Sequence, residues 1–142
     1  MGRGGAGMPL QWTQALSVGI PEIDAQHQEL FRRVNRLLEA ALAGDPREAG
    51  ATLAFLGEYA VTHFSAEERF MRDVGYPGLR RHREEHELFV ADLRALDREF
   101  AEGGPTPGLV ARLNRQVGDW LRGHVCVTDM AMGHFVSRAR RP

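Results

Sequence analysis

Lysine is absent from the sequence, and all 18 basic residues are arginines. The chain therefore has no lysine amine to act as a Schiff base, a general base or a phosphate anchor, which excludes pyridoxal and P-loop chemistry. Its one cysteine, Cys126, rules out disulfides within the chain and cysteine-rich zinc sites. A lone thiol suits a reducing compartment, so we expect a cytoplasmic protein.

Long apolar runs and an excess of either charge are also missing. No stretch approaches the ~20 apolar residues of a membrane-spanning helix, and residues 1–7 lack the apolar segment of a signal peptide. The 18 basic and 19 acidic residues nearly cancel, so no overall field attracts nucleic acid or an anionic membrane. We expect neither as a partner.

The length of 142 residues fits one ordinary domain. A hydrophobic share of 43% and a charged share of 26% are typical of a globular chain and exclude a disordered or fibrous one. We expect a flexible tail over residues 1–9 and one folded domain over residues 10–142.

Four segments carry apolar residues at steps of three and four, the period of a one-sided helix. They cover residues 24–43, residues 46–73, His82 to Phe100, and Leu109 to a point beyond His124.

Breaker-rich sequences separate these segments at residues 44–46, 75–78 and 103–108. Almost no alternating strand pattern is present. Four helices joined by short loops favour an all-α fold, an up-down-up-down four-helix bundle.

Two pairs of metal-ligand residues stand four positions apart on the predicted helices. His63 and Glu67 belong to the second helix, and His82 and His86 to the third. Residues four apart lie only about 40° apart around a helix, so each pair points in one direction. Either pair has the spacing to grip one ion.

The first and last helices contribute one further histidine each. His27 lies three residues before Leu30, and His124 lies three residues after Leu121, so both face the apolar stripe. A single histidine on such a stripe is usually a hydrogen-bonded core residue. A whole set of them is harder to explain that way, because buried imidazoles and carboxylates without partners cost several kcal/mol.

A metal would accept these lone pairs together and turn binding energy into folding energy. The set is rich in imidazole, contains carboxylate and has no thiolate, and it overfills a four-coordinate zinc site. Two ions are needed, and non-haem iron with a bridging carboxylate is the best match.

The order of these residues resembles the hemerythrin family in its bacterial form. The resemblance rests on His27, the segment His63-Phe64-Ser65-Ala66-Glu67, His82 with His86, and His124 followed five residues later by Asp129. It extends over about residues 12–135 through Trp12, the approach to His27 and the turn at residues 71–77.

The resemblance implies a four-helix bundle with a non-haem di-iron centre that binds dioxygen reversibly. One iron would have three histidine ligands and the other two, with two bridging carboxylates and a solvent-derived oxo or hydroxo bridge. The implied ligands are His82, His86 and His124 for the first iron, His27 and His63 for the second, and Glu67 and Asp129 as bridges. Dioxygen would bind at the iron with two histidines. Phe64, Trp120 and Leu121 match the family's apolar pocket residues.

Asp129 would not emerge from helical spacing. Five residues place it roughly 140° from His124 on a regular helix, so spacing alone equally suggests a solvated charge. If both residues bind one centre, the backbone must leave regular α-helix, and we predict a break or wide turn near residues 125–128.

The remaining candidates have simpler interpretations. We expect Cys126 to be a small buried apolar residue, and we expect His134 to lie outside the metal site. Methionines 130 and 132 are expected to pack the end of the bundle. A solvated charged face is predicted from Arg69, Arg72, Arg80, Arg81 and Arg83 with the neighbouring Glu68, Glu84 and Glu85.

Three functions are compatible with such a centre. The favoured one is a dioxygen carrier, store or sensor that changes no substrate, and a signal would then need an unknown protein partner. A di-iron enzyme that reduces peroxide or nitric oxide is the first alternative, although no general acid stands out. Iron storage or delivery is the second, although the acidic residues resemble ordinary helix surfaces. We expect a monomer.

Overall fold

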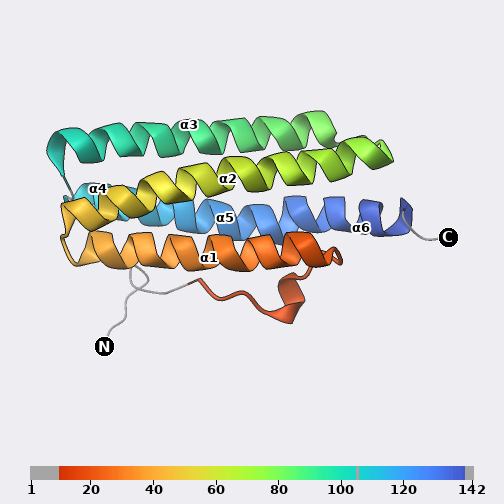
Figure 1. Ribbon diagram of the computed structural model, residues 1–142, viewed down its shortest axis with the longest axis horizontal. Coiled ribbons are helices and arrows are strands. Elements are labelled where there is room, and N and C mark those ends of the chain that lie inside the picture. Colours follow the sequence, from red (N-terminus) through yellow and green to blue (C-terminus); the bar gives the residue numbers. More distant parts are fainter. Residues whose placement is uncertain (1–9, 105, 140–142) are drawn as a thin grey trace.

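The computed structural model describes residues 10–104 and 106–139, so the predicted tail over residues 1–9 lies outside the described residues. Four helical rods lie side by side, and successive rods run in opposite directions (Figure 1). This arrangement confirms the predicted up-down-up-down bundle. The first three rods are α1 (Pro21–Leu42), α2 (Pro46–Val74) and α3 (Leu79–Gly103).

The fourth rod is one continuous helix whose α-helical hydrogen bonding is interrupted at two places. Two π-helical turns interrupt the α-helix, and the second of them separates α5 from α6. No described helix combines the length and apolar character needed to cross a membrane. The segments of this rod are α4 (Pro107–Leu113), η3 (Asn114–Asp119), α5 (Trp120–Gly123), η4 (His124–Asp129) and α6 (Met130–Ala139).

Local sequence signals account for the helix ends. The Asp45 side chain accepts a hydrogen bond from the Glu48 backbone at the start of α2, where Pro46 occupies the first turn. Thr106 caps α4 in the same way, again ahead of a proline. Gly75 ends α2 in the left-handed conformation, with φ 66°, which glycine adopts without a steric penalty.

Two apolar clusters fill the interior. The larger contains Leu30, Val34, Leu56 and Phe64, and the smaller contains residues such as Met71. Both α1 and α2 contribute residues to each cluster. In α1, His27 lies between the residues of the smaller cluster and those of the larger, and in α2 Glu67 does so. Polar residues therefore occupy a layer that apolar side chains close at both ends. The other members of the smaller cluster include Val18, Ile20, Ile23, Met132 and Val136.

An arm before α1 lies along the bundle and includes the short helix η2 (Gln14–Leu16) (Figure 1). At one end, Asn35 accepts a hydrogen bond from the Leu10 N–H at 2.7 Å and donates one to the Leu10 carbonyl at 2.9 Å. At the other, the carboxylate of Asp24 accepts bonds from the Ser17 hydroxyl and the Val18 N–H. These bonds hold the arm against α1.

The arm reaches α6 at Gly133, where there is no room for a side chain. A Cβ atom at this position would lie 2.2 Å from the Val18 carbonyl oxygen and 2.7 Å from the Val18 Cβ. Backbone atoms cannot yield as a flexible side chain does, so the arm has to move if the side chain grows.

We predict that Gly133→Ala lowers the free energy of unfolding by about 1–3 kcal/mol, the usual cost of overpacking. Urea unfolding of the metal-free protein would measure the loss. The control is Gly57→Ala in α2, where an added Cβ meets nothing within 4 Å. That control should be neutral or stabilising by up to about 1 kcal/mol, because alanine favours helix over glycine. Equal stability of the two variants would contradict the close packing of the arm.

Candidate metal centre

Helices α2 and α3 direct their ligand pairs into the polar layer, as the spacing predicts. His63 and Glu67 are 1% and 0% exposed, and both face inward from α2. His82 and His86 occupy adjacent turns of α3 and are equally buried, each 2% exposed. His27 enters from α1 and is completely buried.

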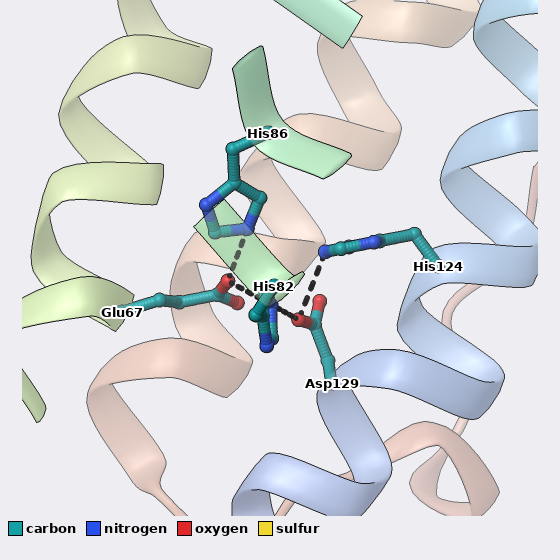
Figure 2. Close-up of side chains that lie close together, drawn as sticks. All are labelled: Glu67, His82, His86, His124 and Asp129. Carbon is teal, nitrogen blue, oxygen red and sulfur yellow. Dashed lines mark ion pairs between the residues drawn. The ribbon is translucent and has the colours of Figure 1, made fainter. Parts of the chain in front are cut away.

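The fourth rod supplies His124 and Asp129, and the π-turn η4 spans the two residues. In such a turn the backbone bonds to the fifth residue rather than the fourth, so residues five apart come to one face. The expected wide turn near residues 125–128 is confirmed, and the helix continues through it without a break. Figure 2 shows both side chains pointing toward those of α2 and α3.

The seven side chains form two adjoining groups that have the geometry to hold a metal ion each. Both carboxylates belong to both groups. The Oε1 atom of Glu67 lies 3.1 Å from His86, whereas Oε2 lies 2.9 Å from His63. The larger group has His82, His86 and His124 with the two carboxylates, and the smaller has His27 and His63 with the same two.

Asp129 also divides its oxygens between the groups. Its Oδ1 atom lies 2.9 Å from the Nε2 atom of His82 and 3.1 Å from that of His124. Its Oδ2 atom lies 3.0 Å from the Nε2 atom of His27. Each carboxylate thus offers one oxygen to each group, which is the arrangement of a bridging ligand.

The separations between the ligand atoms fit a common ion. Two atoms at right angles around an ion, each about 2.1 Å from it, lie about 3.0 Å apart. In the larger group the contacts of Asp129 with His82 and His124, and of Glu67 with His86, fall between 2.9 and 3.1 Å. The contact between His82 and Glu67 is longer, at 3.4 Å.

Hydrogen bonding does not account for this burial. Among the described residues, the Nε2 atoms of His82, His86 and His124 are buried without a hydrogen-bond partner, although oxygens lie nearby. The Oε1 atom of Glu67 and both carboxylate oxygens of Asp129 are likewise buried without a hydrogen-bond partner. Buried polar atoms are normally satisfied, so six such atoms in these two adjoining groups indicate missing electron-pair acceptors. The donor set fits a metal pair.

Without metal, protons must balance the two carboxylates. Burial alone would lower the pKa of His27, but Asp129 and Glu67 outweigh it and raise that pKa to about 10. The same balance raises the pKa of His82 to about 9. Burial would raise the pKa of Glu67, yet the charge of His63 and the nearby imidazoles hold it well below its usual value.

Three imidazoles of the centre donate a hydrogen bond outward from Nδ1. His63 donates to the Gln26 side-chain oxygen at 2.7 Å, and His86 donates to a carboxylate oxygen of Glu68 at 2.8 Å. His124 donates to Glu85 at 2.9 Å. Because these acceptors take the Nδ1 proton, each Nε2 lone pair points to the centre.

These three acceptors were not predicted from the sequence. The prediction of a solvated face is wrong for Glu68 and Glu85, because both are half-buried and accept hydrogen bonds from candidate ligand histidines. Each follows or precedes a ligand by one residue, which is the only signal the sequence carries. An acid in such a position is equally typical of an ordinary helix surface.

Apolar side chains pack against the larger group. The Phe64 ring stacks on His86 with centroids 3.8 Å apart, and the Trp120 ring stacks on His124 at 4.4 Å. Phe89 stacks in turn on Trp120. Leu121 is 2% exposed and belongs to the larger apolar cluster. The candidate pocket residues therefore wall the imidazoles off from water on the side of the larger group.

The remaining candidates divide into confirmed and wrong expectations. Cys126 is exposed, so its expected burial is wrong: it faces away from the centre, and on that side of the rod lies solvent rather than another helix. His134 is exposed and belongs to neither group. Met132 is buried and Met130 packs beside it, as expected. The five arginines of the predicted charged face are exposed.

A helical bundle with two imidazole and carboxylate groups in its core defines the class of dinuclear metal-binding bundles. The sequence model described as the hemerythrin HHE cation binding domain matches residues 18–135. The chain belongs to the hemerythrin family.

Individual relatives agree with this assignment. A bacteriohemerythrin of Methylococcus capsulatus is 32% identical over 133 residues, which cover 90% of this chain and 97% of that protein. A myohemerythrin of Riftia pachyptila is 33% identical over 88 residues, covering 62% and 68% of the two chains. The crystal structure of a wild-type hemerythrin superposes with a TM-score of 0.82 at 31% identity, over 92% of this chain and 99% of that one.

The raised histidine pKa values predict a pH dependence of the metal-free protein. Protons bound to His27 and His82 stabilise the fold fully below about pH 6.5. This stabilisation is lost as the pH rises through about 9 for His82 and about 10 for His27. The free energy of unfolding should fall by up to about 1.4 kcal/mol per pH unit for each imidazole. Urea unfolding between pH 6 and pH 10 would measure the slope.

His27→Gln should flatten that slope, whereas His134→Gln, at an exposed position outside the cluster, should keep the profile of the unsubstituted protein. Bound metal would replace the protons, so the metal-loaded protein should keep its free energy of unfolding as the pH rises. A metal-free protein whose stability stays constant over this range would contradict the predicted proton balance.

Proposed function

We propose that this protein binds dioxygen reversibly at a non-haem di-iron centre and acts as a carrier, store or sensor. The observation that carries the proposal is the inequality of the two groups. They share both carboxylates, but one has three imidazoles and the other has two. The smaller group offers an ion fewer protein ligands, which leaves room for a small molecule.

The ligand assignment follows from the two groups. His82, His86 and His124 would hold one iron and His27 and His63 the other, while Glu67 and Asp129 would bridge the pair with a solvent-derived oxo or hydroxo ion. When bound, the iron pair would supply the redox chemistry that reversible dioxygen binding needs. Imidazole and carboxylate are the ligands that non-haem iron favours.

The protein's part is to hold the ligands and exclude water. The five histidines and two carboxylates are each at most 4% exposed. Apolar clusters lie at both ends of the polar layer, and Phe64 and Trp120 cover two of the imidazoles. A dry site hinders water and protons from displacing the bound molecule, so it favours release of unchanged dioxygen.

The lone exposed Cys126 suits a reducing compartment. An exposed unpaired thiol in an oxidising compartment would tend to link two molecules. The cytoplasm is therefore the proposed place of action.

Reversible oxygenation is the direct test of the proposal. The purified protein, loaded with iron and reduced without oxygen, should bind two iron ions per chain and gain visible absorbance when oxygen is admitted. Removing the oxygen should restore the first spectrum over repeated cycles. Steady consumption of peroxide or nitric oxide beyond one equivalent per centre would instead favour the di-iron enzyme.

Leu121→Ala should shorten the lifetime of the oxygen-induced absorbance several-fold. The substitution removes apolar volume three residues from His124 and lets water approach the centre. Stopped-flow absorbance would measure the lifetime. Leu96→Ala is the control, because Leu96 is as well buried as Leu121 and lies about 15 Å along α3 from His86. Equal lifetimes in the two variants would show that Leu121 does not protect the centre.

A further inference from the structure

The hydrogen-bond acceptors outside the two ligand groups differ in charge. His86 and His124, both in the larger group, donate to the carboxylates of Glu68 and Glu85. His63, in the smaller group, donates to the neutral amide oxygen of Gln26. No carboxylate accepts an Nδ1 proton from the smaller group among the described residues.

The negative charges of Glu68 and Glu85 are not paired with arginine within the described part of the chain. Neither forms an ion pair with a guanidinium group, although five exposed arginines stand within five positions of one or the other in the sequence. Glu85 has one further partner, the Thr128 hydroxyl, which donates to the same oxygen at 3.0 Å. That bond fixes the carboxylate beside His124 and ties α3 to the π-turn η4.

The two rings with carboxylate acceptors are also the two with aromatic stacking partners. Phe64 lies nearly parallel to His86, at 4°, and Trp120 nearly parallel to His124, at 11°. His63 is only tilted against Phe64, at 50°. A ring held by a carboxylate in its plane and an aromatic face above it has a single orientation, and the dry surroundings strengthen the charged hydrogen bond.

We infer that Glu68 and Glu85 are positioning residues that make the larger group the stronger electron donor to a metal, whereas the neutral acceptor Gln26 leaves the smaller group the weaker donor. A carboxylate acceptor draws the Nδ1 proton and makes Nε2 a better donor to a metal. The charge would favour the more oxidised ion at the three-histidine position. This inference rests on the proposed dinuclear function and concerns acceptors beyond the ligands themselves.

The test is a titration of the metal-free protein with cobalt(II), which reports both sites without oxygen chemistry. Visible absorbance and calorimetry should resolve two unequal binding steps. The extra imidazole alone would also make them unequal, so the deciding variants keep the ligands and change only the acceptor charge. They are Glu68→Gln, Glu85→Gln and the reverse substitution Gln26→Glu.

Glu68→Gln and Glu85→Gln should each weaken the tighter step about 10- to 100-fold and leave the weaker one unchanged. Gln26→Glu should strengthen the weaker binding step and so reduce the difference in affinity between the two steps. Glu84→Gln is the matched control, since Glu84 precedes Glu85, is exposed and forms an ion pair with Arg80. In the iron-loaded protein, Glu68→Gln and Glu85→Gln should each also raise one of the two reduction potentials. Glu84→Gln should change neither potential.

Glu→Gln variants that shift both steps equally, or shift neither, would overturn the inference even if oxygen still binds reversibly. Unequal steps that respond as described, in a protein that does not release oxygen, would overturn the proposed function and support the inference. Glutamine keeps an acceptor oxygen for the histidine Nδ1 hydrogen bond, so the variants should fold. Thermal unfolding of the metal-free variants checks this.

Discussion

The burial of seven ionisable side chains between two apolar clusters is the constraint on which the rest of this structure depends. Unpaired polar groups in such a place cost several kcal/mol each, and an apolar core of the same shape would be more stable without metal. The chain reduces the cost with protons when metal is absent, which is why His27 and His82 have raised pKa values. Metal ions would take over that role and add binding energy to folding energy.

The backbone adapts to this constraint in the fourth rod. Three rods present their ligands with ordinary helical spacing, but His124 and Asp129 share one face only through the π-turn η4. The same turn brings Thr128 to Glu85, so a single local change positions both a candidate ligand and an outer acceptor. On the opposite side it leaves Cys126 in solvent. The arm at residues 10–20 meets α6 beyond this turn, and the close approach of Val18 to Gly133 joins that end of the bundle.

Much of the fold could be predicted because its signals are local. Apolar period, proline and glycine placement and capping residues fall within a few positions of one another. They located the first three rods and the start of the fourth to within a few residues, but they did not give the end of the fourth rod at Ala139. His63 with Glu67 and His82 with His86 were found for the same reason, since four residues make one helical turn. Asp129 carries no such signal and entered only through the family resemblance. The expected burial of Cys126 was wrong because composition does not say which helix faces meet neighbours.

The sequence by itself determined the helices, the inward direction of their histidines and the kinds of ligand available, because each depends on residues one turn apart. The family resemblance implied the division into groups of three and two imidazoles, and the tertiary structure alone decided which carboxylate oxygen faces which group. It alone distinguished Glu68 and Glu85 from the surface acids beside them. The contacts of Glu68 and Glu85 join residues 18 and 39 positions apart, and that of His27 with Asp129 joins residues 102 positions apart, so the packing of whole helices sets these distances.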